Sequence, residues 1–280
     1  MAEVKFAEGK KRGILFTVSI MLLSISLLSF AMALSDQAAK SKRAATALAD
    51  IDRITDIYSN MEDEIGDIVS ESANMSVANG TVYLNASLPY SPQVATDLGN
   101  FAAFEANATE QDIAVRMNLT NAKAGTFLIQ PGSTEITQSP GAFYITPKNT
   151  AEGAGSLSSY DVSLMFPSAS ADGAFWDVVA SGDNATGVLV HVRVQDASYA
   201  TNLDFYETLD KYRTSRLNIT QGGATVGYVQ FESPGKLGVH YADNMGLKAS
   251  VGFSNPVYVE ANDNISIAGA VNMTGRVRMA

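Results

Sequence analysis

The amino-acid sequence predicts an α+β protein in which one long N-terminal helix precedes an all-β, sandwich-like head. Three observations predict this fold: an uncharged apolar run at 14–34, an amphipathic repeat after it, and short alternating runs between turn residues from residue 74 onward. We divide the chain into a leader (1–13), a transmembrane helix (14–35), a stalk helix (36–70) and a β-rich domain (71–280).

The apolar run has the length of a membrane span. No charged residue occurs from Gly13 to Ser35. A helix over 14–34 rises about 31 Å, which matches the hydrocarbon core of a bilayer. Its Ser and Thr side chains can bond to helix carbonyls, so they are tolerated in lipid. We therefore expect this segment to contact membrane lipid.

The stalk continues as an amphipathic helix. Its apolar residues recur at alternating spacings of three and four, and the last six of these are Ile51, Ile54, Tyr58, Met61, Ile65 and Ile68. This seam fits two arrangements: packing against the protein's own head, or a parallel coiled coil. Tyr58 and Met61 favour the head, because dimeric zippers prefer β-branched residues and Leu at these positions.

The rest of the chain reads as short strands. Alternating runs such as 160–166 and 187–194 are separated by Gly, Pro and polar turns, which is typical of a sandwich or barrel. The loop at 148–159 is a possible boundary between two β lobes. A short helix is expected at 202–213, where apolar residues recur every third position.

Asn-x-Ser/Thr acceptors are enriched beyond the stalk. They account for nine of the 17 Asn residues, where chance predicts about three. They begin at Asn74, Asn79, Asn85, Asn107, Asn118, Asn184, Asn218, Asn264 and Asn272. This bias favours glycosylation and an extracellular head with a cytoplasmic N-terminus, although Asn and Thr are also common in β-turns. Basic residues flank both ends of the span, so their charges alone set the orientation only weakly.

The junction before the span has a specific pattern. Lys10, Lys11, Arg12 and Gly13 are followed at once by the apolar run from Ile14. This resembles the class III signal peptides of type IV pilins and archaeal pilin-like proteins. The resemblance implies cleavage between Gly13 and Ile14 on the cytoplasmic face, with the apolar helix retained as an assembly stalk.

The resemblance covers about the first 60 residues and has one departure. Most polymerising pilins carry Glu five residues after the cut, whereas this chain has Val18, which fits a minor or non-polymerising member better. Two other fates are open for the segment. It can remain an uncleaved anchor, or it can be a secretory signal peptide cut after the Ala31-Met32-Ala33 site.

The sequence contains no recognisable catalytic constellation. There is no Cys, and His191 and His240 lie in separate strand-like runs without a nucleophile or metal-binding motif. We expect no enzyme activity, no cofactor and no metal site. Asp172-Gly173, Asp183-Asn184 and Asn262-Asp263 are read as turns, with Ca²⁺ binding on such loops and an acidic pair for glycoside hydrolysis as alternatives. Trp176 is expected in the core, with sugar stacking as its alternative. A net charge of −10 argues against nucleic-acid binding.

Together these features predict a pilin-like, N-glycosylated surface protein with a structural or adhesive role. Its N-terminal helix would anchor it in the membrane or in a filament, through self-association or other pilin-like subunits. The alternative is a single-span, membrane-anchored module whose head binds a surface glycan or an envelope protein. An extracellular hydrolase is a third, weaker hypothesis.

Overall fold

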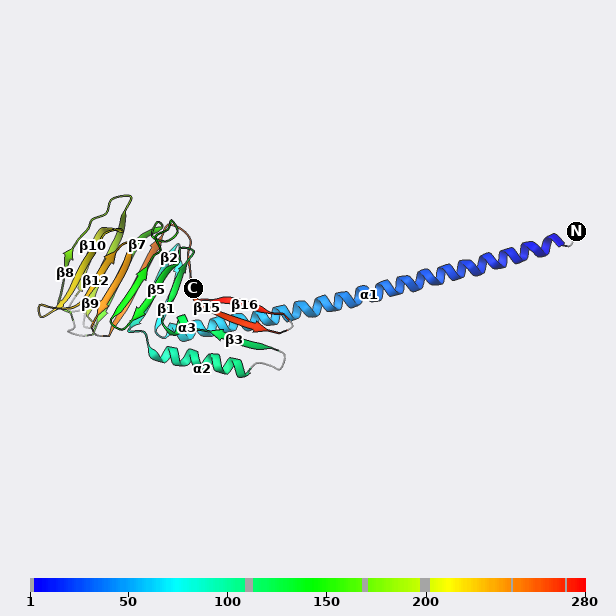
Figure 1. The fold of residues 1–280 in the computed structure, drawn as a ribbon, viewed down its shortest axis with the longest axis horizontal. Coiled ribbons are helices and arrows are strands. Elements are labelled where there is room, and N and C mark those ends of the chain that lie inside the picture. Colours follow the sequence, from blue (N-terminus) through cyan, green and yellow to red (C-terminus); the bar gives the residue numbers. More distant parts are fainter. Residues whose placement is uncertain (1–2, 109–112, 168–170, 197–201, 243, 270) are drawn as a thin grey trace. The chain divides into compact units, whose positions relative to one another are not determined.

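The computed structural model describes residues 3–108, 113–167, 171–196, 202–242, 244–269 and 271–280. Its internal contacts divide the chain into two units, Met1–Thr55 and Asp56–Ala280. The first unit is helical. The second contains the last helical turns of the stalk together with the whole β-rich head (Figure 1).

Helix α1 runs from Glu3 to Ser70. Neither Gly nor Pro interrupts it between Ile14 and Ile65, so its residues favour a continuous helix. The large apolar side chains from Phe16 to Leu34 are all exposed. The helix is long and apolar enough to cross a membrane by length and composition.

In the described part of the chain, the head contains two further helices and sixteen strands. The helices are α2 (Pro92–Ala108) and α3 (Thr120–Lys123). The strands are β1 (Ala73–Ala78), β2 (Thr81–Leu88), β3 (Ala114–Asn118), β4 (Phe127–Gln130), β5 (Thr134–Ser139), β6 (Ala142–Thr146), β7 (Leu157–Phe166), β8 (Gly173–Val178), β9 (Gly187–Asp196), β10 (Asn202–Asp210), β11 (Ser215–Gln221), β12 (Ala224–Glu232), β13 (Lys236–Tyr241), β14 (Met245–Phe253), β15 (Tyr258–Ala268) and β16 (Met273–Arg278).

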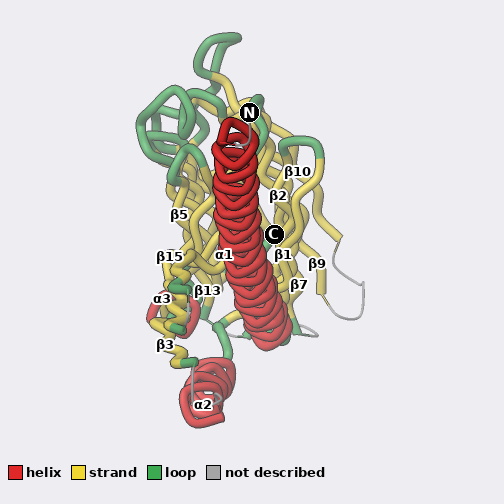
Figure 2. The backbone as a smooth tube through the Cα atoms, turned by 90° about the vertical axis from the view of Figure 1, so that its right-hand side faces the viewer, coloured by secondary structure: helices red, strands yellow, loops and turns green. Residues whose placement is uncertain are grey.

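These strands form two sheets, which Figure 2 shows as separate layers. Sheet A has six strands in the order β1-β2-β14-β7-β9-β10, and its β7–β9 pair is parallel. Sheet B has ten strands in the order β16-β15-β4-β5-β6-β13-β12-β11-β8, with β3 added beside β15. Every other described pairing is antiparallel.

The core lies between the two sheets. Tyr160 of β7 packs edge-on against Phe231 of β12, and Trp176 of β8 packs edge-on against Phe205 of β10. Alternate residues along the central strands are buried, as expected for strands with one face in a core. Trp176 and Phe205 are half-buried on the edge strands of the two sheets, so the Trp176 ring packs at the margin between the sheets and not in the buried core expected for it.

One local prediction from the sequence was wrong, and one long helix of the head was missed. The segment expected as a helix at 202–213 is mainly strand β10, which pairs along its whole length with β9. Helix α2 was not expected, although Ser91 and Pro92 form a recognisable helix start: the Ser91 Oγ accepts a hydrogen bond from the Gln93 amide at 3.2 Å.

The segment at 148–159, expected as a loop, lies inside the second unit, and its last three residues begin strand β7. Strands from before and after it are neighbours in both sheets, because β2 pairs with β14 and β6 pairs with β13. The head is therefore a single β unit in which the two halves of the sequence interleave.

Candidate functional site

The C-terminal turns of α1 are built into the head. Tyr58, Met61, Ile65 and Val69 are buried. The Tyr58 hydroxyl donates a hydrogen bond to the carbonyl oxygen of Arg276 in β16 at 2.6 Å. Its ring lies against Gly275, where a methyl group would overlap the phenol. This end of the stalk helix is thus part of the folded head.

The buried positions differ slightly from the predicted seam. Ile54 is buried, Ile51 is exposed and Ile68 is half-buried, while Val69 takes the innermost place in the last turn. Positions that repeat every 3.5 residues move gradually around a straight helix of 3.6 residues per turn, so they do not all stay on one face. This explains why the buried position in the last turn is Val69 and not Ile68.

The residues of the predicted leader cleavage lie within α1. Gly13 and Ile14 are helical, and their side chains fall outside the described part of the chain. Val18 is 49% exposed. The cut itself is a chemical event that a folded chain does not record, so cleavage stays a prediction.

Eight of the nine predicted glycosylation residues are exposed. The exception is Asn218 in β11, whose Oδ1 accepts a hydrogen bond from the Arg216 Nε at 2.8 Å. Asn79 lies in the two-residue turn between β1 and β2, with positive φ at both Asn79 and Gly80. The exposed acceptors are Asn74, Asn79, Asn85, Asn107, Asn118, Asn184, Asn264 and Asn272.

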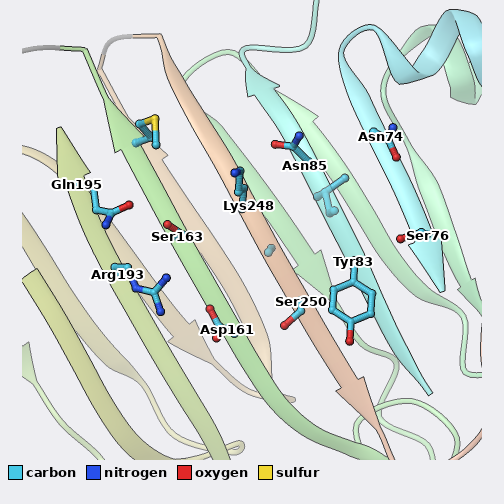
Figure 3. Close-up of a pocket in the computed structure, with 13 residues that line it drawn as sticks. Asn74, Ser76, Tyr83, Asn85, Asp161, Ser163, Arg193, Gln195, Lys248 and Ser250 are labelled. Atoms are coloured by element: carbon cyan, nitrogen blue, oxygen red, sulfur yellow. The ribbon is translucent and has the colours of Figure 1, made fainter. Parts of the chain in front are cut away.

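The outer face of sheet A carries a polar groove of about 470 Å³ (Figure 3). It crosses five strands, from β1 to β9. Its chemistry is mixed: two cations, several amides and hydroxyls, one carboxylate and one aromatic ring. The lining polar residues are Asn74, Ser76, Tyr83, Asn85, Asp161, Ser163, Arg193, Gln195, Lys248 and Ser250.

His191 sits at the β9 side of this face between two carboxylates. Its Nδ1 lies 3.0 Å from Asp161 of β7, and its Nε2 hydrogen bonds to Asp204 of β10. Tyr206 stacks on the imidazole with a centroid distance of 3.8 Å. Because both ring nitrogens are engaged and the residue is only 5% exposed, His191 ties three strands together and offers no free base or metal ligand.

The second histidine belongs to a ladder on sheet B. His240 stacks on Tyr228 and meets the edge of Tyr144, while Arg216 covers the other face of Tyr228 at 3.9 Å. Burial lowers the pKa of His240, and the nearby charges of Lys236 and Arg216 lower it further. His240 and Tyr228 thus contact each other and the side chains of neighbouring strands, as cross-strand pairs that stabilise a sheet do.

The remaining candidates for chemistry are structural. Within the described ranges, no group of three or more acidic or His side chains could hold a metal ion. Asp172, read as a turn residue, accepts a hydrogen bond from the Gly222 amide at 2.6 Å. Asp263, also read as a turn residue, is instead a fully buried member of β15.

Comparisons with models of protein families, with curated proteins and with solved structures found no match.

Proposed function

We propose that this protein is a pilin-like, N-glycosylated surface protein, anchored by its N-terminal helix in a membrane or filament and displaying its β head outside the cell. Its role is structural or adhesive. The observation that supports the proposal most strongly is that the two ends of α1 have different surroundings. An exposed, uncharged apolar stretch lies at Phe16–Leu34, and the same helix ends with four side chains buried in the head.

A helix that displays a head above a membrane needs both an apolar anchoring segment and an end that packs against the head. An exposed apolar run of this length is costly in water and is stabilised by lipid or by apolar helices of neighbouring subunits. The buried turns attach the end of the helix to the head, and α1 is followed directly by the hydrogen-bonded strands β1 and β2. A head that has to transmit tension or contact a surface benefits from that attachment.

The acceptor residues also support the proposal. Transfer of a glycan to Asn requires access to the side chain, and eight of nine acceptors meet this condition. No acceptor occurs before Asn74. The distribution is therefore that of a protein whose glycosylated part lies entirely beyond its anchor.

The decisive experiment is mass spectrometry of the N-terminus of the protein isolated from its own envelope. We expect a start at Ile14, the product of pilin-type processing, and its loss in a Gly13→Leu variant that retains the basic residues. A Lys5→Gln variant is the matched control, since it changes the leader but not the junction. A start at Met1 or Ala2 would contradict pilin-type processing and leave a fixed anchor. A start at Leu34 would also contradict the anchor.

A further inference from the structure

We propose that the groove on sheet A is the docking surface of this chain's own N-linked glycan, attached at Asn85 and containing acidic sugars. This inference rests on the proposed glycosylated surface protein and assigns one of its glycans a fixed position. In this arrangement the sugar chain lies across the sheet toward Arg193 instead of extending into solvent.

The attachment point lies inside the groove. Asn85 is exposed in the middle of β2, and its side chain lines the groove together with Asn74 and Lys248 of the neighbouring strands (Figure 3). Ser87, the hydroxyl residue of the same acceptor motif, is exposed two positions later in the same strand. Any glycan on Asn85 therefore starts within the groove.

The strand register provides a straight path from this point. Asn85 is the partner of Lys248, Lys248 is the partner of Ser163, and Ser163 is the partner of Arg193. These residues form one row perpendicular to the strands. Three strand spacings separate its ends, about 14 Å, a length that a short oligosaccharide covers.

A second row runs beside the first. Tyr83 is the partner of Ser250, Ser250 is the partner of Asp161, and Asp161 is the partner of His191. Tyr83 is 48% exposed, so one face of its ring is accessible to the C–H groups of a sugar near the attachment point. The Ser hydroxyls in both rows can donate to and accept from sugar hydroxyls.

The charges on this face favour an acidic sugar. Lys248 and Arg193 form no ion pair with any described residue, and the one carboxylate lining the groove, Asp161, is bonded to His191. The lining residues thus carry two cations and one carboxylate, a net positive charge in a chain whose net charge is −10, and Asp204, the β10 partner of Arg193, is also bonded to His191. A carboxylate or sulfate group on the glycan would complement them through charge-assisted hydrogen bonds.

Covalent attachment makes weak contacts sufficient. A tethered ligand has an effective concentration in the millimolar range or above. A few hydrogen bonds and two ion pairs therefore hold a glycan that would not bind measurably from solution. This favours the chain's own glycan over a free envelope polysaccharide, because a glycan on Asn85 would also cover the groove against other ligands.

The test compares the exposure of glycans within one protein. Full-length protein from its own envelope is treated with periodate, which oxidises accessible vicinal diols, and each glycopeptide is followed by mass spectrometry. We expect the Asn85 glycan to react several-fold more slowly than the glycan on Asn184, which lies in an exposed turn. The Lys248→Gln/Arg193→Gln double variant should make the two rates equal.

Controls separate docking from folding. The Lys148→Gln/Arg213→Gln variant removes the same charge from exposed residues outside the groove and should keep the difference in rate. If the double variant in the groove is unstable, Lys248→Gln alone, at an exposed position, should still speed oxidation at Asn85. Equal oxidation rates for the Asn85 and Asn184 glycans in the native protein would overturn the docking inference but not the proposed function. The same holds if Asn85 carries no glycan while other acceptors do. If the protein carried no glycan at all, the glycosylation in the proposed function would be wrong as well. The membrane anchor is tested separately, by the N-terminus that mass spectrometry finds.

Discussion

Tyr58 joins the stalk helix to the last strand of the head through one hydroxyl. Besides its bond to the Arg276 carbonyl, this hydroxyl lies 3.2 Å from the Glu62 carboxylate, which also accepts a hydrogen bond from the Arg278 amide. A Tyr58→Phe substitution keeps the ring against Gly275 and removes only the hydroxyl. We expect the free energy of unfolding to fall by about 1 kcal/mol, measured by denaturant titration of the detergent-solubilised protein. Tyr83→Phe, at an exposed position of sheet A, is the control and should change nothing.

Asp263 holds the start of helix α3 against strand β15. It is fully buried, and its two oxygens accept hydrogen bonds from the Asn121 and Ala122 amides at 2.9 and 2.7 Å, at the start of helix α3. Asp263→Ala leaves the buried Ala122 amide and the half-buried Asn121 amide without their acceptor, so we expect the free energy of unfolding to fall by about 2 kcal/mol. Its exposed neighbour provides the control, since Asn262→Ala keeps the backbone carbonyl that Asn121 uses. Equal stability of the two variants would contradict the capping role.

The residues around His191 illustrate a limit of sequence reasoning. Asp161 and Asp204 lie 30 and 13 positions away from it, and only the pairing of β7, β9 and β10 brings the three together. The sequence placed His191 correctly in a strand. The register of a parallel pair is set by contacts across the whole sheet, which no local spacing encodes.

At the scale of elements, substitutions at the end of the stalk helix distinguish packing against the head from a parallel coiled coil. Ile65 is fully buried in the head, whereas Ile68 is half-buried. Ile65→Ala should lower the free energy of unfolding by about 3 kcal/mol, and Ile68→Ala by less than about 1 kcal/mol. Thermal unfolding followed by circular dichroism measures both. Similar losses for Ile51→Ala, Ile65→Ala and Ile68→Ala would instead indicate a coiled-coil seam.

The elements that the sequence predicted well are those with strong periodicity. The long helix and strands such as β7 and β9 were predicted because their apolar patterns extend over many residues. Strand β10 was mistaken for a helix because its Leu and Tyr residues recur every third position, while its true partners are on β9. Pairing and burial decide strand formation more than intrinsic preference does, so such short segments are ambiguous in isolation.

At the scale of the whole molecule, buried phenols make the head sensitive to alkali. Burial, with the Glu62 charge, raises the pKa of Tyr58 to about 12, and burial also raises the pKa values of Tyr90, Tyr160 and Tyr241. In the unfolded chain these groups lose their protons near pH 10. Above that pH the folded state binds more protons than the unfolded state, so stability must fall as pH rises.

We therefore expect the melting temperature to fall progressively from pH 10 to pH 12, and the loss of near-ultraviolet circular dichroism to coincide with the appearance of tyrosinate absorbance. Tyr58→Phe should reduce the steepness of this fall, because one of the titrating groups is then absent. Tyr83→Phe should leave it unchanged, since that ring is exposed in the folded head. If tyrosinate formed fully before the tertiary signal was lost, the phenols would be titrating in the folded state, and their burial would not control the alkaline limit of the head.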